Sequence, residues 1–164
     1  MELGRINAMP GYIGGQVHMA GIKWLGGSPS NPQRRGIPRA SGILILTDPE
    51  TMVPLAILEG ALISALRTGA VTGSAARYLA RPDSRVAGLI GAGVQGRTQL
   101  MPLKESLLSI CEPRVFDLDG SRLATFCREM SAELGIRVTP VESHQQCVQA
   151  CDVLSPRLSP VPRS

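Results

Sequence analysis

The sequence predicts an α/β fold in which a partial Rossmann domain, a doubly wound parallel sheet, follows part of an α+β domain. Residues 86–96 read V-A-G-L-I-G-A-G-V-Q-G, a buried strand that runs directly into a G-x-G-x-x-G turn. Strand and helix patterns alternate from this turn to residue 154, as in a parallel sheet. The first 82 residues instead combine a hairpin pattern with one long helix.

The N-terminal segment, residues 1–82, is expected to form the partial α+β domain. Residues 9–15 are rich in Pro and Gly and predict a turn, residues 16–24 predict a strand, and residues 26–38 predict an exposed loop. A buried strand over residues 41–47 should pair with residues 53–58 as a hairpin.

From Glu59 the pattern becomes helical, with small residues at three- and four-residue spacing that favour close helix packing. Pro82 should end this helix and mark the domain boundary. The second domain, residues 83–154, should then contain strand 86–90, helix 94–109, strand 114–118, helix 121–134, strand 136–140, a short helix to residue 150 and strand 151–154.

The last segment, residues 155–164, carries three prolines, which neither continue a central strand nor begin a normal helix. We expect it to be an aberrant tail, produced by truncation or by an out-of-frame continuation.

The glycine turn has the features of a nicotinamide dinucleotide site. Gly91 permits the tight turn, Gly93 permits close approach of the ligand, and Gly96 permits close packing of the next helix, whose free N–H groups attract an anion. Asp117 lies 21 residues beyond Gly96, where a carboxylate accepts hydrogen bonds from an adenosine ribose. The acid favours NAD over NADP because it would repel a 2′-phosphate. The alternative is a glycine-rich turn in another kind of α/β domain.

Composition and charge narrow the class of protein. The 17 Lys and Arg residues exceed the 13 Asp and Glu residues by four, without a basic block, so nucleic acid is not an expected partner. No apolar run approaches the length of a membrane span, and no leader is recognisable. The four cysteines show neither C-x-x-C nor a partnering His, which predicts free thiols in a reducing cytoplasm and no metal site.

Two basic side chains in apolar surroundings are candidates for anion binding. Lys23 lies in an apolar strand, where it must meet an anion or lose its proton, although a surface or snorkelling lysine is the alternative. Arg67, followed by Thr68, lies in a helix with few other charges and could grip a carboxylate or phosphate. A salt bridge to Glu59 is the structural alternative. Structural roles are expected for three further side chains, Asp48, His18 and His144.

These residues carry a resemblance to a known family. The runs G-I-K-W-L-G-G-S-P-S-N-P, G-I-P-R-A-S-G-I-L-I-L-T-D-P-E-T, P-L-A-I-L-E-G-A-L-I-S-A-L-R-T-G-A-V and G-L-I-G-A-G-V-Q-G resemble the ornithine cyclodeaminase/μ-crystallin family from about Met9 to Leu154. Trp24, the P-R-A-S run and the form of the glycine turn are most similar to its branch that makes 2,3-diaminopropionate for siderophores.

The resemblance implies roles for individual residues. Substrate carboxylates would be bound by Lys23 and Arg67. The cofactor would be bound by Ser41 on the nicotinamide side, by Arg67 and Thr68 at the phosphate, by Gly91, Ala92, Gly93, Val94 and Gln95 at the pyrophosphate, and by Asp117 at the ribose.

The resemblance also implies an activity. Enzymes of that branch use NAD to oxidise N-(2-amino-2-carboxyethyl)-L-glutamate and release 2-oxoglutarate and 2,3-diaminopropionate. Ornithine cyclodeamination, ketimine reduction and a non-catalytic crystallin-like binding role are the alternatives. Family members are longer homodimers whose catalytic aspartate lies beyond residue 164. We therefore expect this chain to be an inactive cytoplasmic fragment with no catalytic residue of its own.

Overall fold

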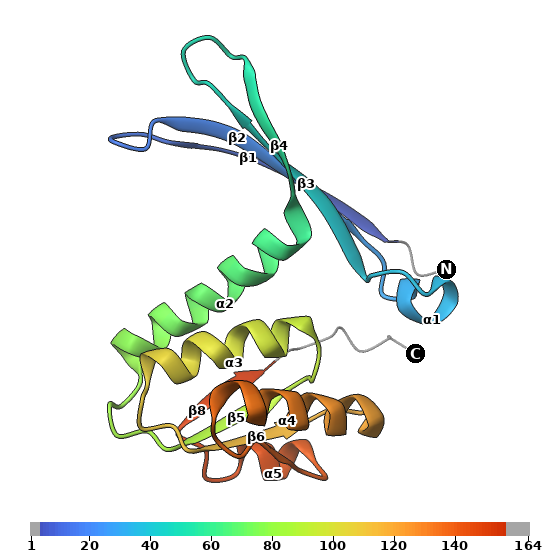
Figure 1. Cartoon of the computed structure of the whole chain (residues 1–164), viewed down its shortest axis with the longest axis vertical. Helices are drawn as coiled ribbons and strands as arrows, with labels where there is room; N and C mark the ends of the chain where they lie inside the picture. Colours follow the sequence, from blue (N-terminus) through green and yellow to red (C-terminus); the bar gives the residue numbers. More distant parts are fainter. Residues whose placement is uncertain (1–3, 157–164) are drawn as a thin grey trace. The chain divides into compact units, whose positions relative to one another are not determined.

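The computed structural model describes residues 4–156, which belong to two compact units, Met1–Ser64 and Ala65–Ser164. The division lies inside helix α2 (Gly60–Leu79), ahead of residue 82, where the sequence predicts the domain boundary. Each unit has its own sheet (Figure 1).

The first unit is an antiparallel meander in which each strand pairs with the next along the chain. Its strands are β1 (Arg5–Ile13), β2 (Met19–Gly27), β3 (Ala40–Thr47) and β4 (Pro54–Glu59). The predicted hairpin of β3 and β4 is confirmed. In its turn, Oδ1 of Asp48 accepts the N–H groups of Glu50 (2.9 Å) and Thr51 (2.8 Å), the structural role expected for this acid.

Three local predictions in this unit are wrong. Most of the segment predicted as a turn, residues 9–15, lies in β1, because pairing with β2 overrides the turn preference of Pro and Gly, and Pro10 is tolerated in an edge strand. The actual turn follows, with Gly15 at φ +64°, so β2 begins at Met19 rather than at residue 16. The expected loop contains a short helix, α1 (Asn31–Arg35), which ends at Gly36 with φ +64°.

Helix α2 confirms the predicted helix and begins at an acidic cap. The Glu59 carboxylate accepts the N–H groups of Ala61 (2.7 Å) and Leu62 (2.9 Å), which no helical carbonyl can satisfy. Further along, small residues admit helix α3 (Val94–Ser106) at close range. A Cβ on Gly69 would lie 1.7 Å from the carbonyl oxygen of Thr98.

The second unit contains the predicted parallel sheet, with strand order β7-β6-β5-β8. Its elements after α2 are β5 (Val86–Ile90), α3, β6 (Glu112–Phe116), α4 (Gly120–Leu134), β7 (Thr139–Pro140), α5 (His144–Val148) and β8 (Val153–Pro156). Strand β8 continues two residues past Leu154, into the segment expected to be a tail. The rest of that segment, residues 157–164, lies outside the described residues.

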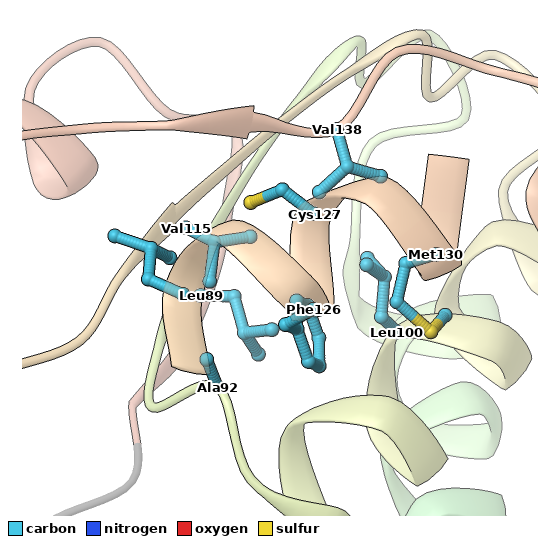
Figure 2. Packing of buried hydrophobic residues seen from close by; sticks show 9 residues of the cluster. Leu89, Ala92, Leu100, Val115, Phe126, Cys127, Met130 and Val138 are labelled. Atoms are coloured by element: carbon cyan, nitrogen blue, oxygen red, sulfur yellow. The ribbon is translucent and has the colours of Figure 1, made fainter. Parts of the chain in front are cut away.

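One hydrophobic cluster holds α3 and α4 against the sheet (Figure 2). Leu89 of β5 and Val115 of β6 meet Leu100 of α3 and Phe126 and Met130 of α4, and all five are at most 2% exposed. This packing fixes the carboxyl ends of β5 and β6 relative to the two helices that follow them.

Helix α5 covers the opposite face of this sheet. Successive strand residues point to opposite faces, and a Cβ on Gly88, next to Leu89, would lie 2.5 Å from the Cys147 carbonyl oxygen of α5. At the start of β5, the Asp152 carboxylate accepts hydrogen bonds from the N–H groups of Arg85 (2.8 Å) and Val86 (2.9 Å). This contact ties the start of β8 to the start of β5.

The cysteines are free thiols, as predicted. Burial raises the pKa of the Cys127 thiol to about 11, so this side chain remains protonated in the core. Within residues 4–156, no helix combines the length and apolar character needed to cross a membrane. The same residues contain no cluster of His, Cys, Asp and Glu suited to a metal ion.

Candidate functional site

The glycine turn after β5 is fastened to the end of β6. The N–H group of Gly91 donates to the Phe116 carbonyl oxygen (2.8 Å), and that of Ala92 donates to Oδ2 of Asp117 (2.7 Å). Gly91 has φ +110°, a backbone conformation that residues with a side chain rarely adopt. A Cβ on Gly96 would lie 2.2 Å from the Gly91 carbonyl oxygen, so the helix can approach the turn only with glycine there.

Helix α3 begins at this turn with a bare N-terminus. Its N-cap is Gly93, in an extended conformation and without a side chain to accept from the first-turn N–H groups. These groups and the helix dipole therefore form an anion-binding end. In the same turn, Oε1 of Gln95 is buried and, within the described residues, accepts no hydrogen bond. The free N–H donors at this helix end suit the pyrophosphate of a dinucleotide.

Asp117 is the acid at the end of β6, and its side chain is only 8% exposed. Oδ1 accepts from the Asp119 N–H group (2.9 Å) and from Nη2 of Arg122 (2.5 Å), while Oδ2 accepts from Ala92 and from Nε of Arg122 (3.3 Å). Burial alone would raise the pKa of Asp117, but the hydrogen bonds from Arg122, Asp119 and Ala92 outweigh it and lower this pKa. The carboxylate is therefore ionised at neutral pH.

Arg122 is a residue of this site that sequence reasoning missed. It lies in the first turn of α4, whose N-cap Asp119 accepts its backbone N–H group (3.0 Å). Its half-exposed guanidinium bridges Asp117 and Asp119. The signal that could have found it is a basic residue five positions after the acid, at the start of the helix that follows β6.

A cleft of about 480 Å³ lies between the glycine turn and α4. Its lining consists of Ala92, Gly93, Val94, Arg97, Ser121, Arg122, Thr125 and Phe126. Arg97 contacts Glu129 and Glu133 and lies over the Phe126 ring. The cleft opens beside the carboxyl end of β5, which pairs with β6 on one side and β8 on the other, the switch point where open α/β sheets bind ligands.

Lys23 and Ser41 lie in the first unit. Lys23, half-buried on β2, stands opposite Met9 and Leu44, and its Nζ donates to Oγ of Ser64 (3.2 Å). Sequence reasoning missed Ser64, which is 9% exposed and adjoins Lys23 only because β2 and α2 meet. Ser41 is exposed on β3, opposite Gly26.

Arg67 and Thr68 lie on α2 within the second unit, Arg67 exposed and Thr68 half-buried. Glu59, the alternative ion-pair partner of Arg67, uses both carboxylate oxygens to cap α2. The structure brings Gly91–Gln95 and Asp117 together in the second unit, whereas Lys23 and Ser41 are placed in the first.

The two histidines have local contacts of a structural kind. Nδ1 of His18 lies 3.0 Å from the Tyr12 hydroxyl oxygen. The ring of His144 lies against Phe116 at the end of β6, with 6.1 Å between ring centroids.

Comparison with known proteins places this geometry in a family. The family model described as "Ornithine cyclodeaminase/mu-crystallin family" matches residues 1–156. The chain is 43% identical over 122 residues to an N-((2S)-2-amino-2-carboxyethyl)-L-glutamate dehydrogenase of Staphylococcus aureus. These aligned residues make up 74% of this chain and 36% of the staphylococcal protein.

Two solved structures are similar over most of the chain. A Δ1-pyrroline-2-carboxylate reductase of Thermococcus litoralis, in complex with NADH and L-proline, aligns with a TM-score of 0.87 and 40% identity, covering 93% of this chain and 46% of that one. An archaeal alanine dehydrogenase dimer with bound NAD aligns with a TM-score of 0.82 and 36% identity. This alignment covers 94% of this chain and 46% of the alanine dehydrogenase chain. The chain thus spans less than half the length of these relatives.

Proposed function

Because the chain belongs to the ornithine cyclodeaminase/mu-crystallin family, we propose that it forms the dinucleotide-binding half of an NAD-dependent oxidoreductase for an amino-acid-like substrate. The observation that carries this proposal is the glycine turn fastened to Asp117 at the switch point of the sheet. The proposed substrate is N-(2-amino-2-carboxyethyl)-L-glutamate, supported by the 43% identity to the staphylococcal dehydrogenase.

In the proposed complex, the residues of the glycine turn hold the pyrophosphate. The first-turn N–H groups of α3 would bind its oxygens, and Gly93 would let the backbone approach them. Asp117 would face the adenosine ribose, and Ser41 the nicotinamide side. When bound, NAD supplies the hydride acceptor.

The substrate clamp would consist of Lys23 and Arg67. Nζ of Lys23 donates to Oγ of Ser64 at 3.2 Å, and this contact would orient the ammonium group for a substrate carboxylate. Arg67 would bind a second carboxylate and a cofactor phosphate through its planar fork, with Thr68 beside it. Together they would turn the reacting C–H bond toward the nicotinamide, which is an orientation effect.

The proposed reaction balances as an oxidation followed by hydrolysis. The carbon that bears the secondary amine would give up a hydride, for which bound NAD would be the acceptor, and the nitrogen would give up a proton, which would leave a C=N bond. Water adds to this carbon and the C–N bond breaks, which releases 2-oxoglutarate and 2,3-diaminopropionate. We place this reaction in the cytoplasm, consistent with four free thiols, and in siderophore biosynthesis. We also propose that the full-length protein is a homodimer, since the similar alanine dehydrogenase is a dimer.

Two measurements test the proposal. Calorimetric titration of the 164-residue chain with NAD should show binding. NADH absorbance, followed in a protein that joins this chain to the remaining length of the family fold, should rise faster with N-(2-amino-2-carboxyethyl)-L-glutamate than with L-ornithine or L-alanine.

Each contrary result identifies a different error. Failure to bind NAD would refute the cofactor site, and faster turnover of ornithine or alanine would refute the substrate. Imine reduction is the second candidate, favoured by the 40% identity to the reductase that binds NADH and L-proline. It predicts NADH consumption with a cyclic imine. NAD binding without any turnover would favour a crystallin-like binding role.

A further inference from the structure

We propose that Arg122 is a specificity-determining residue of the dinucleotide site, and that it lets the site accept a 2′-phosphorylated dinucleotide beside NAD. This inference rests on the proposed function, because it concerns the adenosine end of the same cleft. It changes the role expected for Asp117, whose negative charge by itself predicts strong rejection of NADP.

The Asp117 carboxylate already has a donor for each of its lone-pair positions. An ionised carboxylate offers about four lone-pair positions. The four donors within hydrogen-bond distance are the N–H groups of Ala92 and Asp119 together with Nε and Nη2 of Arg122. With its side chain 8% exposed, Asp117 can accept from a ribose hydroxyl only if Arg122 moves away.

Of Asp117 and Arg122, it is Arg122 that faces the cleft. Its side chain is 50% exposed and lines the cleft next to Ser121. A guanidinium has five N–H donors, and the contacts to Asp117 and Asp119 leave donors that can reach a ribose oxygen or a phosphate. Arginine beside the ribose is the usual solution for binding a 2′-phosphate.

The charges around the expected position of the 2′-phosphate favour an anion. Arg122 neutralises Asp117, and the N-terminus of the 15-residue helix α4 adds a positive partial charge. Asp119 opposes them, but it caps α4 and lies 3.5 Å from Nη1 of Arg122. Arg97 of α3 also lines the cleft, but it forms salt bridges with Glu129 and Glu133 of α4. Arg122 is therefore the cation best placed for a 2′-phosphate.

The experiment compares the dissociation constants of NAD and NADP for the purified 164-residue chain, by calorimetry at constant salt. We expect the wild-type constants to differ by less than about tenfold. In Arg122→Gln, NADP should bind at least about tenfold more weakly while NAD changes less than about threefold, because the freed Asp117 accepts from the 2′-hydroxyl and repels the phosphate.

Two further variants separate this role from a general effect of charge or folding. Arg122→Lys keeps the charge without the fork and should give an intermediate ratio. Arg128→Gln removes an exposed cation from the same helix and should leave the ratio unchanged. Circular dichroism establishes that each variant is folded.

The contrary outcomes are distinct. Binding of NAD with a wild-type preference above about a hundredfold, or an unchanged ratio in Arg122→Gln, would overturn the role of Arg122 and leave the proposed function intact. Failure of the chain to bind either dinucleotide would overturn both.

Discussion

A single carboxylate joins three parts of the candidate site. Asp117 directly follows β6, accepts a hydrogen bond from Ala92 of the glycine turn, and accepts hydrogen bonds from Arg122 of α4. Its loss would therefore loosen the turn as well as remove a charge. The effect should be visible in stability without any ligand.

We expect Asp117→Asn to lower the free energy of unfolding at pH 7 by about 1–2 kcal/mol, since hydrogen bonds to a charged group are replaced by weaker ones. The pKa of Asp117 is lowered in the folded state, so its stabilisation is present above the ordinary value of about 3.9 and is lost as pH falls through the folded-state value.

Urea unfolding of the wild type and of Asp117→Asn at several pH values measures this effect. The difference between them should shrink below about pH 4. Asp83→Asn, at a site where the Asp side chain is 87% exposed, is the control and should change stability little at pH 7. A difference that stays constant down to pH 2 would show that the charge of Asp117 does not stabilise the fold.

At the scale of elements, α2 and α3 lie so close that a Cβ on Gly69 or Gly73 of α2 would collide with α3. Gly69→Ala should destabilise the second unit by about 1–3 kcal/mol, because the new methyl group would lie 1.7 Å from a backbone carbonyl oxygen and the helices must separate. Thermal or urea unfolding of the variant measures the loss.

The matched control is Gly120→Ala, at the start of α4. A Cβ there meets no atom within 4 Å, so the substitution should be neutral or stabilising by up to about 1 kcal/mol. Equal destabilisation by both variants would mean that α2 and α3 are not tightly packed in solution.

The sequence predicts the elements of the second unit well, because a buried strand, a glycine turn and an alternating pattern depend on local residues. The β3–β4 hairpin and α2 could be predicted equally well from the sequence. The strand conformation of residues 9–13 could not, because it depends on pairing with β2, which no local pattern encodes. The same limit applies to the site. Gly91 and Asp117 follow from spacing, and Arg122 has a local signal in its place five residues after Asp117. Ser64 has none, because it meets Lys23 only where strand and helix come together in the fold.

The whole molecule places its hydrophobic core unevenly. Among the described residues, every buried hydrophobic side chain lies at Ala65 or later, whereas large apolar side chains of the first unit, such as Ile6 (66%) and Ile57 (69%), are exposed. The meander has hydrogen-bonded strands but no buried hydrophobic side chain of its own. Its strands should therefore open at a lower free energy than those of the second unit.

Hydrogen exchange followed by mass spectrometry checks this expectation. Amides of β1–β4 should exchange at least about tenfold faster than those of β5 and β6, after correction for intrinsic rates. Repeating the measurement at a second protein concentration is the control, because self-association would protect the meander in a concentration-dependent manner. Equal protection of both sheets at low concentration would show that the meander is stable without such burial.

The contact between Asp152 and the start of β5 has a consequence for biosynthesis. Val86 and the carboxylate that accepts its N–H group are 66 residues apart, a distance that a ribosome covers in roughly 3–13 seconds at about 5–20 residues per second. The meander pairs only neighbouring strands and can form as soon as it leaves the ribosome. Strand β5, in contrast, waits with one edge bare until β8 has been synthesised. This interval is when the nascent chain is most exposed to aggregation and most dependent on chaperones.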